Sequence, residues 1–139
     1  MLSPAKTYER ARKTEGQTVI GWALDRAERV ELLLQFPPRY ANVVANHVTL
    51  AARVGREAPL PEQVTGEIIG RADDGHGVEA MVVRIEGSTD RPDGSIWHIT
   101  WSLGNGRRAK ESNDVIAAHG WQPFELPMPV QLTPARWPR

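Results

Sequence analysis

The 139-residue sequence contains no cysteine. Disulfide bonds and zinc sites built on thiolates are therefore excluded, and a reducing compartment suits such a chain. Runs of about 20 apolar residues, the length of a membrane-spanning helix, are absent as well. The first residues, MLSPAKTYERARKTEGQ, lack the apolar core of a secretion signal. We therefore expect a soluble cytoplasmic protein that does not contact a membrane.

Net charge is also lacking, because 17 basic residues balance 17 acidic ones. The chain as a whole is not attracted to nucleic acid or to membranes, so any binding of a polyanion must come from a local patch. Apolar residues make up 40% of the chain, enough for one core. We expect a partly ordered N-terminal segment over 1–17, followed by a single domain over 18–139.

The pattern of apolar residues predicts elements in the order strand–helix–strand–strand–strand–strand–helix–strand. Asp25 is suited to cap a helix in which Val30, Leu33 and Leu34 are apolar, Gly120 is suited to end a second helix, and Pro134 favours an edge position for the last strand. The predicted strands cover 18–25, 42–54, 64–72, 78–87, 95–103 and 129–137, and the predicted helices 26–36 and 111–120. The order predicts an α+β domain with a mixed or antiparallel sheet and two helices on one face.

Two strands carry the same polar pattern. HVTL begins at His47 and HITW begins at His98, each with a threonine two residues after the histidine. Side chains alternate along a strand, so His47 shares a face with Thr49, and His98 shares a face with Thr100 and Ser102. If the two strands are close, their polar faces bring two imidazoles and two hydroxyls together. Trp97 and Trp101, on the opposite face of the second strand, are expected in the core.

Such a set of groups is suited to acid–base chemistry. One imidazole takes a proton from an attacking water or hydroxyl while the other gives a proton to the leaving oxygen, and each role is typically worth about 10²–10⁴ in rate. Threonine hydroxyls donate to oxygens on which negative charge builds. The pattern favours in-line attack at phosphorus, for which neither a metal nor another cofactor is expected. A pair of structural histidines is the alternative interpretation.

A few other residues are candidates for substrate contacts. Arg53 falls on the His47 face and is suited to hold a phosphate, whereas Arg39 and Tyr40 precede the first motif in a loop expected at the entrance. Ser102 is a candidate for an auxiliary contact. The basic cluster Arg107, Arg108 and Lys110 either steers a nucleic-acid backbone or is a solvated loop.

The two motifs resemble the paired histidine–x–threonine motifs of the two-histidine (2H) phosphoesterase superfamily. TVIGWALD, FPPRYANVVANHVTL, RPDGSIWHITWSL and ESNDVIAAHGW are most similar to the cyclic phosphodiesterase domains of fungal-type tRNA ligases and to bacterial RNA-repair-like relatives. The resemblance begins at about residue 18 and covers nearly all of the chain that follows.

The resemblance implies a bilobal fold with both motifs lining a central groove. It implies a metal-independent phosphodiesterase that opens a 2′,3′-cyclic phosphate on an RNA end or a small nucleotide. His47 and His98 would be the acid–base pair, with His47 protonating the leaving oxygen and His98 activating water, and Thr49 and Thr100 would hold the phosphate. An RNA terminus or cyclic nucleotide is the expected partner, and nothing indicates an obligate protein partner.

Two other functions compete with this hypothesis. The same fold could bind a nucleotide or an RNA end without turnover. A metal-dependent hydrolase could use His47 and His98 with Asp73 or Asp74 from the sequence DDGHG, although the composition of DDGHG favours a turn.

Overall fold

The computed structural model describes residues 2–138, which form a seven-stranded sheet and three helices. All neighbouring strands are antiparallel, in the order β2-β6-β5-β4-β7-β1-β3. The elements are α1 Pro4–Ala11, β1 Thr18–Leu24, α2 Arg26–Gln35, β2 Asn42–Val43, β3 His47–Val54, β4 Val64–Asp73, β5 Val78–Arg84, β6 His98–Leu103, α3 Glu111–His119 and β7 Gln122–Pro138. The expected α+β class and antiparallel sheet are confirmed.

The N-terminal segment over 1–17, expected to be only partly ordered, contains helix α1. The Ser3 hydroxyl caps this helix by accepting from the N–H of Lys6 at 3.2 Å, and Pro4 occupies its first turn. Tyr8 and Ala11 lie on one side of the helix and pack into the main core beside β3. The short helix is therefore stabilised by tertiary packing, which the polar composition of this segment did not indicate.

The predicted strand 42–54 is interrupted by a sharp turn. Ala45 has a φ of 42°, a left-handed conformation that breaks the extended chain. The segment before it, β2, pairs with β6, and the segment after it, β3, pairs with β1. The chain thereby passes from one end of the sheet to the other within a few residues.

The last strand is longer than predicted and is not at an edge. β7 pairs with β4 over residues 122–132 and with β1 over 132–138, and only Leu132 partners both neighbours. Pro134 therefore has a strand on one side only, so its nitrogen, which has no hydrogen to donate, costs no hydrogen bond. The edge expected from Pro134 exists locally, although the strand as a whole is central.

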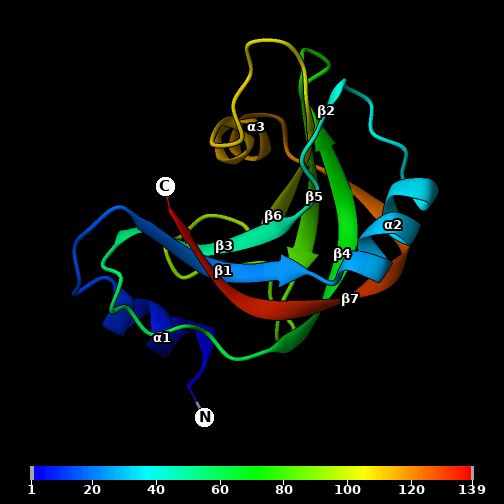
Figure 1. The fold of residues 1–139 in the computed structure, drawn as a ribbon. Helices are drawn as coiled ribbons and strands as arrows, with labels where there is room; N and C mark the ends of the chain where they lie inside the picture. The colour runs from blue at the N-terminus through cyan, green and yellow to red at the C-terminus, as the bar shows by residue number, and fades with distance from the viewer. Residues whose placement is uncertain (1, 139) are drawn as a thin grey trace.

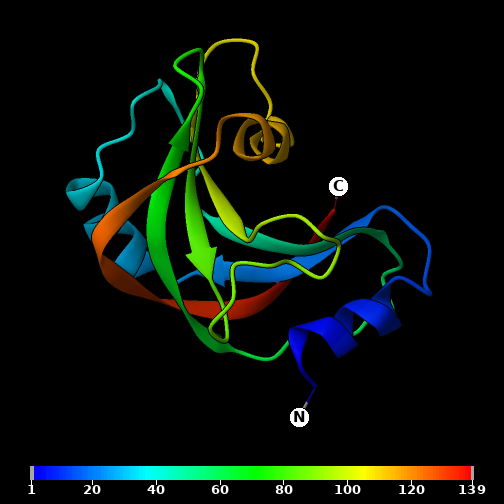
Figure 2. The same ribbon diagram turned by 180° about the vertical axis from the view of Figure 1, so that it is seen from behind.

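The curved β7 divides the sheet into two parts, each with one histidine–threonine motif (Figure 1). We call β3, β1 and the second half of β7 the His47 sub-sheet, and β2, β6, β5, β4 and the first half of β7 the His98 sub-sheet. Figure 2 shows from behind how β7 runs from one sub-sheet to the other. Strands β3 and β6 contact each other without pairing, so the two motifs face one another.

The core lies between the two sub-sheets. Trp22 and Trp97 meet edge to face with ring centroids 5.4 Å apart, and the Trp101 indole donates to the Phe36 carbonyl at 2.9 Å. Trp97 and Trp101 are 2% and 0% exposed, as expected from their alternation. Buried aromatic pairs of this kind fix how the two sub-sheets are oriented.

The two predicted helices, now α2 and α3, do not share one face of the sheet. Ile116 of α3 packs with Ala80 of β5, whereas Leu32 of α2 packs into the main core with Met81, on the opposite side of that strand. Asp25 caps α2 and Gly120, with a φ of 69°, follows α3, as predicted. In α2, however, Leu32 is buried, while Val30 and Leu34 are 59% and 77% exposed. Within residues 2–138 no helix has the length and apolar character needed to cross a membrane.

Candidate active site

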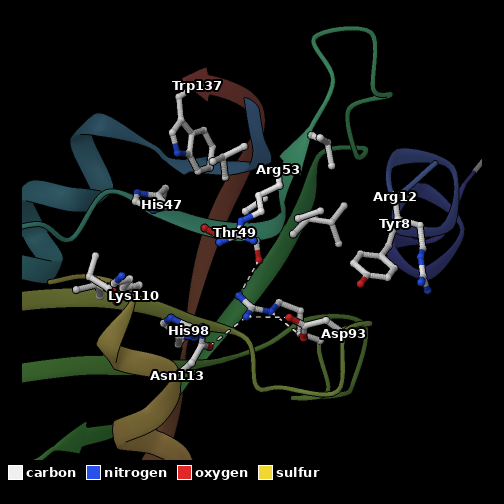
Figure 3. A pocket seen from close by; sticks show the side chains of 18 of the residues that line it. Tyr8, Arg12, His47, Thr49, Arg53, Asp93, His98, Lys110, Asn113 and Trp137 are labelled. Carbon is white, nitrogen blue, oxygen red and sulfur yellow. Dashed lines mark hydrogen bonds and ion pairs between the residues drawn. The ribbon is translucent and has the colours of Figure 1, made fainter. Parts of the chain in front are cut away.

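Both histidine–threonine motifs line one cavity of about 670 Å³. His47 and Thr49 reach it from β3, and His98 and Thr100 reach it from β6. Figure 3 shows the two imidazoles on strands that face each other across the opening. The convergence that the sequence pattern required is therefore present.

A main-chain contact holds the two motifs together. The N–H of Ala45, two residues before His47, donates to the carbonyl of Thr100 at 2.9 Å, and the N–H of Val44 donates to the carbonyl of Trp101 at 2.9 Å. The left-handed turn at Ala45 then directs the chain into β3. As a result, the start of the first motif is tied directly to the second motif.

Each imidazole is oriented through its Nδ1 atom. Nδ1 of His98 lies 2.9 Å from the Ile96 carbonyl, which can only accept, so this nitrogen carries the proton. Nδ1 of His47 donates to Oδ1 of Asn46, and the Trp137 ring lies against the imidazole at a centroid distance of 4.7 Å. In both neutral rings Nε2 is therefore the nitrogen free to accept a proton.

Both imidazoles are neutral at pH 7. Burial lowers the pKa of His98 to about 4, and the positive charge of Arg91 and the nearby His47 act in the same direction. Burial also lowers the pKa of His47 below its ordinary value. The cavity thus disfavours added positive charge until an anion enters it.

The two threonines differ in their surroundings. The Thr100 hydroxyl lies 3.3 Å from the Ala109 carbonyl and 2.9 Å from the Ser112 hydroxyl, so it is already hydrogen-bonded within the protein. Within residues 2–138, the hydrogen bonds of Thr49 involve only its main chain. Thr49 is therefore the freer donor of the two toward a ligand.

Cationic side chains surround the cavity. Arg12, Arg53, Arg91 and Lys110 line it, and among residues 2–138 Asp93 supplies the one carboxylate of the lining. Asp93 is itself paired with Arg91, with an Nη2–Oδ2 distance of 3.1 Å. In a chain without net charge, this lining forms the local positive patch that an anionic ligand requires.

Arg91 connects the walls of the cavity. Its guanidinium contacts the Thr49 carbonyl on β3 at 3.4 Å, the Asn113 side chain on α3 at 3.1 Å and Asp93 in its own loop at 3.1 Å. The side chain is only 7% exposed. Arg91 therefore holds β3, α3 and the loop before β6 in a fixed arrangement around the imidazoles.

No protein-family model, curated protein or solved structure matches this chain. The chemistry of the cavity is therefore inferred from its own residues.

Ser102, expected on the same face as His98 and Thr100, does not line the cavity. The pairing of β5 with β6 shifts between Glu79 and Ala80, so that Thr100 faces Ala80 but Ser102 faces Glu79. This bulge reverses the alternation, because one residue is inserted between the two pairs. The Ser102 hydroxyl instead donates to Oε1 of the buried Glu79 at 2.6 Å.

Arg39 and Tyr40 also lie outside the residues that line the cavity. Arg39 Nη1 lies 2.7 Å from one oxygen of Asp73, and the Tyr40 hydroxyl donates to the other at 2.6 Å. Burial alone would raise the pKa of Asp73, but the hydrogen bonds from Tyr40 and Arg39 lower it below its ordinary value. These residues form a separate polar cluster that attaches the loop before β2 to β4.

The carboxylates considered for a metal site are not beside the histidines. Asp73 and Asp74 cap the turn at DDGHG: Oδ1 of Asp73 accepts from Gly75 N–H, and Oδ1 of Asp74 accepts from His76 N–H, each at 2.8 Å. The predicted turn is confirmed. Across residues 2–138 no group of histidine and acidic side chains has a metal-binding arrangement.

The residues of the basic cluster at 107–110 have different surroundings. Arg107 pairs with Asp74 at 2.9 Å and with Glu111 at 3.1 Å, so its side chain stabilises the loop before α3. Only Lys110 of the three reaches the cavity.

Several lining residues were not predicted from the sequence. Tyr8 belongs to α1 and Arg12 is the residue that caps the end of this helix, Arg91 lies in a loop, and Asn113 and Trp137 come from α3 and β7. Of these, α1 could have been found from its Ser3–Pro4 start, which is a favoured beginning of a helix. The others reach the cavity only through tertiary packing.

Proposed function

We propose that this protein is a metal-independent phosphoesterase of the two-histidine type, which opens a 2′,3′-cyclic phosphate on an RNA end or a small nucleotide. The observation that carries the proposal is that His47, Thr49, His98 and Thr100 line one cavity with a cationic rim. Two neutral imidazoles on facing strands can serve one phosphoryl group from opposite sides, as in-line displacement requires.

His98 is assigned as the general base. Its proton lies on Nδ1, held by the Ile96 carbonyl, so that Nε2 accepts a proton from water. The water oxygen then forms a bond to phosphorus while one of the two ester P–O bonds of the ring breaks. The low pKa of His98 keeps this ring neutral and ready to accept at pH 7.

His47 is assigned as the general acid. A cyclic phosphate carries a negative charge, and its arrival raises the pKa of a neighbouring imidazole. His47 is less buried than His98 and is the more easily protonated of the two. Its Nε2–H then passes a proton to the ribose oxygen that leaves. Protons are thus accounted for without a metal ion.

The remaining lining groups balance the charge on phosphorus. The Thr49 hydroxyl is placed to donate to a non-bridging oxygen, and the Arg91 guanidinium adds positive charge from the cavity wall. Asp73 and Asp74, which the metal-hydrolase alternative needs, do not line the cavity. The metal-free mechanism is therefore the better supported one.

The test is to incubate the purified protein with adenosine 2′,3′-cyclic phosphate, with and without EDTA, and follow the reaction by phosphorus NMR. We expect a monoester product at an unchanged rate in EDTA. His47→Ala and His98→Ala should each lower kcat by about 10²–10⁴. His119→Ala, a histidine exposed at the end of α3, is the matched control and should retain full activity.

The result also separates the alternatives. Binding of the cyclic nucleotide without product would identify a non-catalytic binding module. Loss of activity in EDTA, restored by a divalent metal, would support the metal hydrolase. Normal turnover in both histidine variants would rule out the two-histidine mechanism.

A further inference from the structure

The cavity extends well beyond the imidazoles. In Figure 3, His47, His98 and Lys110 lie at one end, and Tyr8 of helix α1 and Arg12, which caps this helix, lie at the other, with Arg53 between them along β3. We propose that the wall that runs from Arg53 to this second end, lined by Arg53, Tyr8 and Arg12, is a subsite for a backbone phosphate of an RNA strand whose cyclic end occupies the imidazoles. The inference rests on the proposed function and adds that an oligonucleotide is preferred to a mononucleotide.

The backbone at Arg53 is the first observation in favour of this subsite. Arg53 has a φ of 59°, a left-handed conformation that costs a residue with a β-carbon roughly 1–2 kcal/mol per residue. Glycine would avoid this strain, yet the position holds an arginine whose side chain lines the cavity. A strained residue beside a candidate active site suggests that its side chain has a role there.

The charges at this end are the second observation. Among residues 2–138, neither Arg12 nor Arg53 takes part in an ion pair with a carboxylate. Arg12 is instead held over the Tyr8 ring, with its Cζ 5.8 Å from the ring centroid. Two guanidinium groups without a carboxylate partner, on two elements that line the same cavity, are suited to bind phosphodiester oxygens.

The spacing is the third observation. Arg53 follows Thr49 along a part of β3 in which the pairing with β1 has two irregularities, and Figure 3 places it on the side of Thr49 that leads from the imidazoles toward helix α1. A mononucleotide bound by its cyclic phosphate presents no second phosphate to this wall. A short oligonucleotide carries further phosphates away from the imidazoles and can reach it.

The experiment compares adenosine 2′,3′-cyclic phosphate with a tetraadenylate that ends in a 2′,3′-cyclic phosphate. We expect kcat/KM to be at least about tenfold higher for the tetranucleotide. Arg12→Gln and Arg53→Gly should each lower kcat/KM for the tetranucleotide by about tenfold, mainly through KM, and lower kcat/KM for the mononucleotide by a clearly smaller factor. Arg10→Gln, on the same helix but outside the cavity lining, is the matched control.

Arg53→Gly also controls for folding. Glycine accepts a positive φ without strain, so this variant should unfold at the same or a higher temperature than the wild type. A loss of oligonucleotide preference in a variant of undiminished stability then comes from the missing guanidinium.

A binding measurement keeps the test independent of turnover. Fluorescence anisotropy of a labelled tetraadenylate over a range of salt concentrations should show a weaker salt dependence in each variant, with the slope reduced by about 0.7 for one lost phosphate contact. The subsite would be overturned if the wild type had equal kcat/KM for the two substrates. It would also be overturned if each variant lowered kcat/KM for the mononucleotide and the tetranucleotide by the same factor. Absence of hydrolysis with either substrate refutes the proposed function instead, and an unchanged salt slope then refutes the subsite as well.

Discussion

The main-chain N–H of Ala45 donates to the main-chain carbonyl of Thr100 at 2.9 Å. This bond ties the segment that leads into the first motif directly to the strand of the second, although the two residues are far apart in sequence. Because Ala45 is buried and has a φ of 42°, the contact depends on a backbone conformation that few side chains tolerate.

A β-branched residue at Ala45 should disturb both motifs. Ala45→Val adds methyl groups to a filled core at a positive φ, and we expect a loss of about 2–4 kcal/mol in the free energy of unfolding. Ala45→Gly relieves the φ but removes a buried methyl group, and should stay within about 1 kcal/mol of wild type. Urea unfolding measures both variants. Equal stabilities would show that the turn does not constrain the site.

Stability should fall as the solution becomes acidic. The pKa of His98 is about 4 in the folded protein and 6.5 in an ordinary histidine, so the unfolded chain binds more protons between these values. We expect the free energy of unfolding to drop as the pH falls below about 6.5, by about 3 kcal/mol from this residue once the pH is below 4. His47 acts in the same direction.

Denaturant midpoints measured between pH 7 and pH 4 check this, with His98→Gln as the comparison. The variant should lose most of the pH dependence in this range. If its midpoints follow those of the wild type at every pH, His98 is not buried in its neutral form.

The proposed acid and base also fix the pH range of activity. His98 must be unprotonated, which holds above about pH 4, and His47 must be protonated, which holds below a pKa that is itself lowered from 6.5. The profile of kcat/KM, which reports the free enzyme, should therefore be bell-shaped with its maximum at mildly acidic pH. The profile of kcat should lie at higher pH, because bound phosphate raises the pKa of both rings. A flat profile from pH 4 to 8 would contradict the assignment of both histidines.

Removing the Arg91 guanidinium should change both structure and titration. Arg91→Met removes the ion pair of Asp93 and the hydrogen bond to Asn113, and takes a positive charge away from His98. We expect a loss of about 2 kcal/mol in stability and a rise in the pKa of His98, measured by NMR titration of its ring. Arg84→Met, which breaks a half-exposed pair with Glu67, is the matched control and should cost less than about 1 kcal/mol. An unchanged pKa of His98 in Arg91→Met would show that the guanidinium does not act on the imidazole.

Ser102 should matter for stability and not for activity. Ser102→Ala removes the hydroxyl that donates to the buried Glu79, at an expected cost of about 1.5–3 kcal/mol in the free energy of unfolding. At a temperature where the variant is folded, its kcat and KM should equal those of the wild type. A selective fall in kcat would mean that Ser102 reaches the substrate after all.

Local rules predicted much of the fold. Asp25 and Gly120 mark helix ends because a side-chain oxygen or a left-handed residue satisfies main-chain groups wherever the helix lies. The alternation in WHITW placed Trp97 and Trp101 in the core because one face of a strand in this sheet is buried. The same alternation placed His47 on one face of its strand with Thr49, and His98 on one face of its strand with Thr100.

Local rules failed where a residue's neighbours decide its environment. Ser102 left the predicted face because of a bulge that depends on the pairing of β5 with β6. Arg39 and Tyr40 were expected near a substrate, but Asp73 on another strand binds both. Val30 was expected to be part of the apolar face of α2, yet 59% of it is exposed.

The sequence by itself determined the class of the fold, most of its elements and the two histidine–threonine pairs, since these follow from periodicity and from side-chain chemistry within a few residues. Only the tertiary structure decided that the pairs share one cavity, that Arg91 joins its walls and that α1 supplies its far end. Such relations depend on strand order, on a left-handed turn at Ala45 and on a bent β7, and each of these is set by contacts between segments far apart in the chain.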